Sequence, residues 1–222
     1  MTASMPSDMT AETFGEEIAS AVTHGIGAAL SIAGLTVMIV LAAINGTAWS
    51  VVGVSVYGAA LILLYLSSTL YHGIPHPATK RVFRVLDHST IYLLIAGTYT
   101  PIALAGLAGE PDWLLLAVVW ALALFGIVLQ AVRPGQFPRL RIGLYVAMGW
   151  LAIAWARPVI ASLGWDGAGL LLAGGIAYTS GIAFYAWDRL RFNHAIWHLF
   201  VLAGSTAHFL AIVFYMLLVH PG

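Results

Sequence analysis

Seven long apolar runs constrain this chain more than any other feature of its sequence. Each has about 20 residues or more, enough for a helix to cross the hydrocarbon core of a bilayer. Short links rich in turn-forming residues separate them, so no soluble domain fits between them. The runs are Ile18–Ile44, Trp49–Gly73, Asp87–Leu107, Trp113–Val132, Arg141–Ala161, Gly167–Trp187 and His194–Val219. The sequence therefore predicts an all-α membrane protein, with a polar segment over residues 1–17 and a seven-helix transmembrane bundle over residues 18–219.

The composition agrees with residence in a membrane. Hydrophobic residues make up 61% of the chain and charged residues only 8%, whereas soluble domains carry about 25% charged residues. The formal net charge is zero and no basic tract is present, which argues against a nucleic-acid partner. The chain has no cysteine, so a metal ion would have to be held by histidine, aspartate or glutamate. The first 17 residues contain no Lys or Arg, so we expect a retained first helix rather than a secretory signal.

The basic residues predict how the bundle is oriented. All but one lie near the second, fourth and sixth links between the runs. They are Lys80, Arg81, Arg84, Arg133, Arg139, Arg141, Arg189 and Arg191, with Arg157 as the exception. Because cytoplasmic loops carry an excess of Lys and Arg, the even-numbered links are expected in the cytoplasm. We therefore expect a multi-pass protein of the cell membrane with its N-terminus in the cytoplasm and its C-terminus outside.

This orientation brings ionisable side chains from distant runs to one depth, near the cytoplasmic face. They are Glu17, His24, His72, Asp87, His194 and His198. Ionisable groups inside membrane helices are costly, and they usually face the bundle interior and serve a function. The shared depth therefore predicts a functional site at the cytoplasmic end.

Three histidines in this set predict a metal site. His194 and His198 are four residues apart, so they share one face of a helix. His72 adds a third imidazole nitrogen. Three protein ligands and one open position are typical of catalytic zinc, whereas Mg²⁺ and Ca²⁺ prefer oxygen. We expect Zn²⁺, which would lower the pKa of a bound water toward about 7 and polarise a carbonyl group.

Two further residues are candidates for catalysis. No glutamate lies between His194 and His198, so a general base must come from elsewhere, and Asp87 has the right depth. Ser68 precedes His72 by one helical turn and could hydrogen-bond to the attacking water or to an oxyanion. Each residue also has a simpler interpretation: Asp87 as a helix N-cap, Ser68 as bonded to its own helix, His72 as a helix C-cap and His194 as an interfacial side chain.

The remaining histidines are assigned no role in the site. His88 points about 100° away from Asp87 around the helix, so we expect it at the membrane interface. His208 lies roughly 15 Å deeper than His198, which predicts a buried polar contact between helices. His76 and His220 fall in a link and in the tail.

The motifs together resemble one known family. They are Glu17-Ile-Ala-Ser20-Ala-Val-Thr23-His24, Ser68-x-x-x-His72, Asp87-His88 and His194-x-x-x-His198. This set resembles haemolysin III, the bacterial branch of the progestin and adipoQ receptor (PAQR) family, which includes the adiponectin receptors. The resemblance implies a seven-helix bundle with a cytoplasmic N-terminus and zinc held by His72, His194 and His198, with Ser68 and Asp87 as further motif members. Ser20 stands where the family pattern has asparagine.

Animal relatives in this family are associated with ceramide hydrolysis. The resemblance and the three-histidine pattern therefore predict a zinc-dependent intramembrane hydrolase that acts on a lipid amide or another acyl bond of a membrane lipid. One alternative is a receptor or regulator of membrane homeostasis with a structural zinc. Another is a pore-forming cytolysin, which is disfavoured because such proteins are usually soluble first and this chain is apolar throughout.

Overall fold

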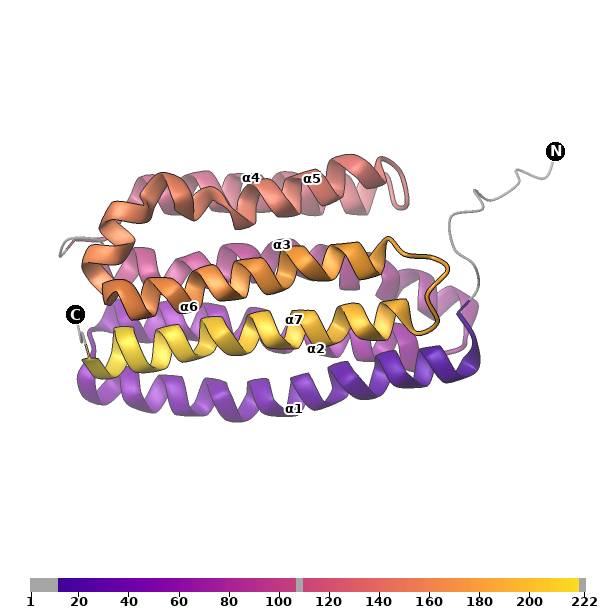
Figure 1. The fold of residues 1–222 in the computed structure, drawn as a ribbon, viewed down its shortest axis with the longest axis horizontal. Coiled ribbons are helices and arrows are strands. Elements are labelled where there is room, and N and C mark those ends of the chain that lie inside the picture. The colour runs from indigo at the N-terminus through magenta and orange to yellow at the C-terminus, as the bar shows by residue number, and fades with distance from the viewer. Residues whose placement is uncertain (1–11, 107–109, 220–222) are drawn as a thin grey trace.

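The fold is a bundle of long helices that run side by side (Figure 1). The structure, a computed structural model, describes residues 12–106 and 110–219. The helices are α1 (Phe14–Asn45), α2 (Ala48–Gly73), α3 (Pro77–Gly106), α4 (Trp113–Val132), α5 (Pro138–Gly149), the 3₁₀-helix η1 (Leu151–Trp155), α6 (Ala156–Tyr185), α7 (Asn193–Leu210) and the π-helix η2 (Ala211–Val219). Residues 1–11, Leu107 and His220, which the sequence predictions included, lie outside the described residues.

Polar caps fix where several helices begin. The Thr13 backbone N–H donates to Oε2 of Glu16 over 2.8 Å, while the Glu16 backbone N–H donates to the Thr13 hydroxyl over 3.4 Å. This reciprocal pair starts α1 ahead of its apolar run. Asp112 caps α4 in a similar way, because its Oδ1 accepts from the Leu115 backbone N–H over 2.9 Å.

Five helical stretches are long and apolar enough to cross a membrane. They are α1, α2, α4, Pro138–Tyr185 and Asn193–Val219. The long stretch Pro138–Tyr185 is not one straight helix, because Gly164 has φ 69° and ψ 175° and so interrupts α6. Figure 1 shows the chain passing from the level of α5 to the level of α6 at one end of the bundle. The result is an all-helical bundle of the kind predicted for a multi-pass membrane protein.

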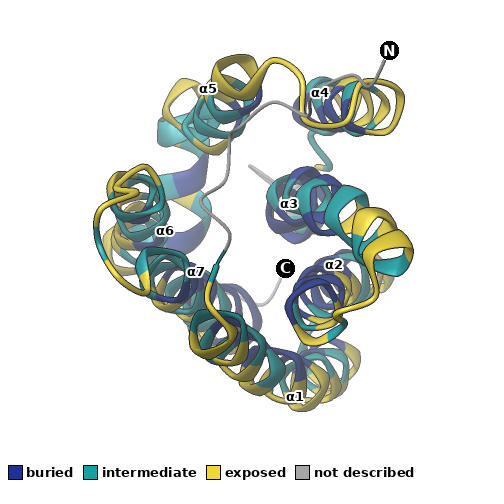
Figure 2. Ribbon diagram, turned by 90° about the vertical axis from the view of Figure 1, so that its right-hand side faces the viewer, coloured by how far each residue is buried: buried dark blue, intermediate teal, exposed yellow. Residues whose placement is uncertain are grey.

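The two surfaces of the bundle differ in the way that a membrane requires. Buried residues face the inside of the ring of helices, and exposed residues face outward (Figure 2). Many outward side chains are large and apolar, for example Leu30, Ile44, Leu114 and Val132. A water-soluble protein rarely exposes so many contiguous apolar side chains, whereas lipid accepts them.

The third helix corrects one sequence prediction. α3 begins at Pro77 rather than at Asp87, so Asp87 lies inside the helix and is not its N-cap. Hydropathy missed the first part of α3 because Lys80, Arg81 and Arg84 make it polar. Proline is well suited to the first helical position, and no second proline follows until Pro101, so the helix forms despite its charges.

Candidate metal centre

Three histidines from α2 and α7 converge at one end of the bundle. His72 lies in the last turn of α2, and His194 and His198 lie in the first two turns of α7. One ring nitrogen from each histidine lies within 4.8 Å of the others, close enough for the three to hold one metal ion. His72 and His198 are buried, and Nε2 of His72 has no hydrogen-bond partner among the described residues. A buried unpaired nitrogen is costly, and a metal ion at this point would remove that cost.

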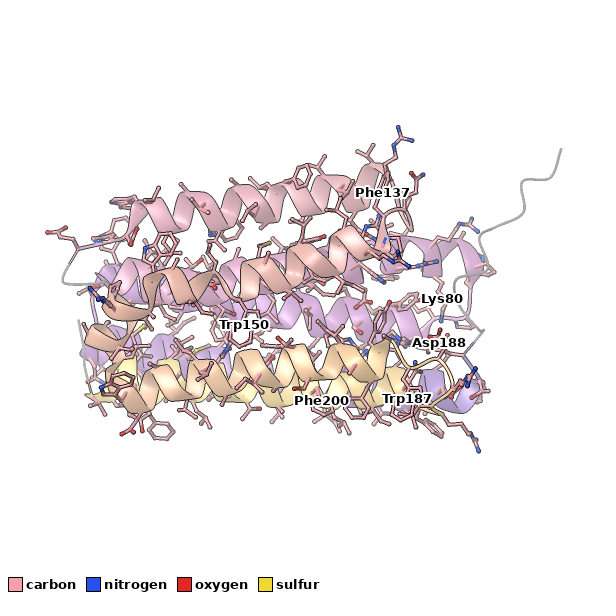
Figure 3. The ribbon with its side chains drawn as sticks, turned by 45° about the horizontal axis from the view of Figure 1, so that its top comes forward. Lys80, Phe137, Trp150, Trp187, Asp188 and Phe200 are labelled. Carbon is pink, nitrogen blue, oxygen red and sulfur yellow. The ribbon has the colours of Figure 1, made fainter. Side chains whose placement is uncertain are left out.

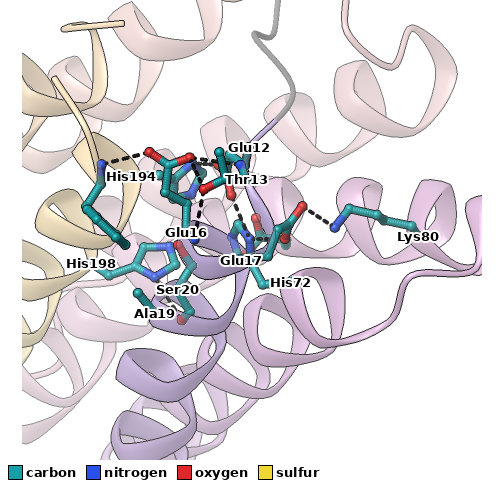
Figure 4. A network of polar contacts seen from close by, with 12 residues as sticks. Glu12, Thr13, Glu16, Glu17, Ala19, Ser20, His72, Lys80, His194 and His198 are labelled. Carbon is teal, nitrogen blue, oxygen red and sulfur yellow. Dashed lines mark hydrogen bonds and ion pairs between the residues drawn. The ribbon is translucent and has the colours of Figure 1, made fainter. Parts of the chain in front are cut away.

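Two carboxylates, those of Glu12 and Glu17, contact the Nδ1 atoms of His72 and His194 (Figure 4). Glu17 Oε2 lies 2.9 Å from Nδ1 of His72, and its other oxygen lies 2.6 Å from Nζ of Lys80. Glu12 bridges the two histidines, with Oε1 3.0 Å from Nδ1 of His194 and Oε2 3.4 Å from Nδ1 of His72. Burial alone would raise the pKa of Glu12, but its hydrogen bonds with His194 and His72 lower that pKa well below its usual range.

The third histidine is held by the backbone of α1. Nδ1 of His198 lies 3.2 Å from the Ser20 carbonyl oxygen and 3.3 Å from the Thr23 hydroxyl. The Nδ1 atoms of all three histidines therefore contact either α1 or Glu12, the residue just before the N-cap of α1. This arrangement leaves Nε2 of each ring as the nitrogen that can face a shared metal ion, since the contact made by one ring nitrogen orients the other.

The first helix also supplies a fourth buried histidine. The His24 ring stacks on the His198 ring with 3.4 Å between centroids and 11° between planes. Neither ring nitrogen of His24 has a partner among the described residues. Ser20, where the family pattern has asparagine, contacts His198 through its backbone, so the different side chain does not alter this contact.

Asp87 and Ser68, the two predicted catalytic residues, lie in different settings, since Asp87 lines a cavity with two of the histidines and Ser68 is not among the residues that line it. Asp87 is 9% exposed and lines an internal cavity together with His194 and His198. Its Oδ2 lies 3.7 Å from Nδ1 of His88. The Ser68 hydroxyl is fully buried and, within the described part of the chain, unpaired, whereas its neighbour Ser67 donates to the Leu64 carbonyl over 3.0 Å. Ser68 is therefore not bonded to its own helix, and its hydroxyl has no acceptor among the residues that the structure describes.

His208 and His88 were each assigned a position from the sequence, and the structure shows what they contact. His208 Nε2 lies 3.0 Å from the Leu171 carbonyl oxygen, a contact between α7 and α6 that confirms the predicted interhelical role. His88 was expected at the membrane interface, but it lines the internal cavity, and its Nδ1 lies 2.9 Å from the Arg84 carbonyl oxygen. The His88 ring does not point away from Asp87, since its Nδ1 lies 3.7 Å from Oδ2 of Asp87.

The cavity has a volume of about 500 Å³, and most of its lining comes from α3, α5, η1, α6 and α7, with single residues or pairs from α1, α2 and α4. His194, His198 and Asp87 line it near the start of α7. Apolar side chains such as Leu94, Ile102, Val159 and Leu172 line most of the remainder. A polar end joined to an apolar space of this size suits an amphiphilic ligand.

Sequence reasoning missed Glu12 as a member of the site. Glu12 lies in the polar segment outside every apolar run, so hydropathy gave no reason to place it against α2 and α7. One signal was available, since Thr13 and Glu16 have the spacing of a capping box, which locates the start of α1 directly after Glu12.

Known proteins are similar to this chain over most of its length. A family model described as "Haemolysin-III related" matches residues 13–209. Hemolysin-3 of Bacillus cereus is 51% identical over 202 residues, which cover 91% of this chain and 92% of the relative. The Hemolysin-3 homolog of Bacillus subtilis (strain 168) is 49% identical over 203 residues, 91% of this chain and 95% of the relative.

A more distant similarity extends to animals. The Monocyte to macrophage differentiation factor of Homo sapiens, a PAQR-family protein, is 29% identical over 178 residues, which cover 76% of this chain and 72% of the relative. The matched segment of the family model includes Glu17, His72, Asp87, His194 and His198. The chain therefore belongs to the haemolysin III family of multi-pass membrane proteins.

Proposed function

We propose that the chain crosses the membrane seven times with its N-terminus in the cytoplasm. The five apolar stretches support this count once Pro138–Tyr185 is divided at Gly164 and α3 is added. The basic residues of the even-numbered links then lie in the cytoplasm, as the positive-inside rule expects. In this orientation the histidine cluster lies close to the inner face of the membrane.

We propose that the cluster binds Zn²⁺ and that the protein is an intramembrane hydrolase of a lipid amide or another acyl bond. The observation that carries the proposal is the position of His194 and His198 on the wall of a largely apolar cavity, with His72 within ligating range. His72, His194 and His198 would hold the zinc, which would act as a Lewis acid toward the scissile carbonyl and lower the pKa of a bound water.

Each residue of the site has a distinct part in the proposed reaction. The cavity holds the acyl chain and keeps bulk water from the scissile bond. The Asp87 carboxylate accepts a proton from the attacking water and passes it to the leaving amine. The Ser68 hydroxyl donates a hydrogen bond to the oxyanion that develops from the carbonyl. Ser68 suits this part because its hydroxyl is already desolvated and makes no competing bond within the described chain.

The test combines metal content with turnover. Purified protein is expected to contain close to one zinc per chain and to hydrolyse at least one member of a panel of lipid amides. His194→Ala is expected to lose zinc and activity, and Asp87→Asn to keep zinc and lose activity. His76→Ala is the matched control, since His76 is exposed and its ring contacts Thr79 rather than any of the three histidines. Unchanged turnover in His194→Ala or Asp87→Asn would refute the hydrolase.

Asp87 also separates the hydrolase from the alternatives. A receptor or regulator with a structural zinc would lose stability on metal removal but would tolerate Asp87→Asn in every functional assay. The Bacillus cereus relative is named Hemolysin-3, which makes cytolysis a second candidate. Lysis of red cells by the purified protein at low concentration, without lysis by an unrelated seven-helix protein, would favour the cytolysin.

A further inference from the structure

A buried arginine lines the cavity, and no carboxylate of the described residues forms an ion pair with it. Arg141 of α5 is 5% exposed and forms part of the cavity wall. Its Nη2 donates to the Arg133 carbonyl oxygen, and its Nε has no partner among the described residues. Burying a guanidinium ion is expensive unless an anion or several acceptors compensate, and one carbonyl oxygen compensates only in part.

A second arginine approaches the same part of the cavity. Arg84 of α3 also lines it, and its Nη2 would lie 3.9 Å from a side-chain carbon added at Gly135, in the link between α4 and α5. Arg133, whose carbonyl oxygen accepts from Arg141, belongs to the same link. The guanidinium groups of Arg84 and Arg141 therefore both lie next to the link between α4 and α5. None of the ion pairs formed within residues 12–106 and 110–219 involves Arg84 or Arg141.

Arg84 and Arg141 lie at the polar end of the cavity. Phe137, from the link between α4 and α5, lies toward the same end of the bundle as Lys80 and Asp188 (Figure 3). Asp87 and His88 line the cavity on the same helix as Arg84. The Asp87 carboxylate is outnumbered by the two guanidinium groups, so this end of the cavity is suited to a negatively charged group.

We propose that Arg141 and Arg84 bind the anionic head group of the amphiphile that occupies this cavity. The inference rests on the proposed function, and it narrows the substrate class to acyl lipids whose head group carries a carboxylate or a phosphate. The planar guanidinium fork matches both groups through paired N–H donors. The acyl chain then extends along the apolar wall formed by α3, α5 and α6, while an uncharged lipid amide would leave the two arginines with only the Asp87 carboxylate on the same cavity wall.

The test measures binding rather than turnover. Radiolabelled palmitate is bound to the full-length, zinc-loaded protein in a neutral detergent. Four unlabelled competitors are then compared for how well they displace it: palmitate, dodecyl phosphate, hexadecanamide and inorganic phosphate. The two anionic amphiphiles are expected to bind at least about tenfold more tightly than the uncharged amide. Arg141→Gln and Arg84→Gln are each expected to abolish that preference. Arg139→Gln is the matched control, since Arg139 is exposed and near the same link.

The outcomes separate this inference from the proposed hydrolase. Every variant keeps the zinc ligands, so attraction of anions to the zinc cancels when the variants are compared. Equal binding of palmitate and hexadecanamide, or an unchanged preference in both arginine variants, would overturn the inference. If inorganic phosphate displaces palmitate as effectively as dodecyl phosphate, the site is one for free anions and not for a lipid head group. If Arg141→Gln does not fold, Arg84→Gln decides the question. Absence of lipid amide turnover would refute the hydrolase without changing any of these binding results.

Discussion

Replacing Glu17 by glutamine is expected to weaken zinc binding although Glu17 is not among the three histidine ligands. Glu17 lies 2.9 Å from Nδ1 of His72 and 2.6 Å from Lys80. The contact fixes the orientation of the His72 ring and makes its other nitrogen a better donor. Glutamine keeps the size of the side chain but removes the negative charge, so the charge-assisted hydrogen bond becomes a neutral one.

The expected loss of zinc affinity in Glu17→Gln follows from the contact between the Glu17 carboxylate and the His72 ring. Loss of a carboxylate that orients a metal-bound histidine lowers metal affinity by about 10- to 100-fold, which corresponds to about 1.4–2.7 kcal/mol. The lower end is expected for Glu17→Gln, because Glu12 also contacts His72 at 3.4 Å and partly compensates. The double variant of Glu12→Gln and Glu17→Gln is expected to approach the upper end.

Competition with a chromophoric chelator measures this affinity directly on the detergent-solubilised protein. Glu110→Gln is the control, because it removes an exposed carboxylate from the link before α4, away from the cluster. His72→Ala gives the loss expected when a ligand itself is removed. If Glu17→Gln binds zinc within twofold of the unmodified protein while His72→Ala does not bind it, the carboxylate does not position the histidine and the reasoning is wrong.

Three further predictions concern the stability of the protein in detergent, and thermal unfolding is the measurement that tests each of them. Zinc removal by a chelator is expected to lower the unfolding temperature, because zinc at about 100 times its Kd contributes about 2.7 kcal/mol; a similar shift in His198→Ala would contradict the proposed site. Gly53→Ala is expected to destabilise the α2–α3 contact by about 1–3 kcal/mol, since the added carbon would lie 2.5 Å from the Pro101 Cα. Gly73→Ala is its control, having nothing within 4 Å, and equal unfolding temperatures would refute the packing argument. Ser205→Ala is expected to cost about 1–3 kcal/mol by leaving the Tyr65 and Tyr178 hydroxyls, each 2.7 Å from Ser205 Oγ, without this partner; no change would mean that water replaces it.

The sequence alone determined most of the helices and picked out the three histidines that the structure brings together. Apolar runs too long for any other structure in a membrane located most of the helices, because the bilayer leaves backbone groups no other partner. The depth of His72, His194 and His198 along their helices followed from the order of the runs, and the structure brings these three rings together. Both inferences use information that is local along the chain.

Tertiary structure decided everything that depends on how the helices rotate and pack. Hydropathy gives no register between α1 and α7, so neither the contact of Glu12 with His194 nor the stacking of His24 on His198 was visible in the sequence. Arg141 is buried on the wall of a cavity whose lining comes from helices far apart in the sequence. The sequence specifies the depth of a residue along a helix axis, whereas the direction in which its side chain points is set by the neighbours that the helix meets in the bundle.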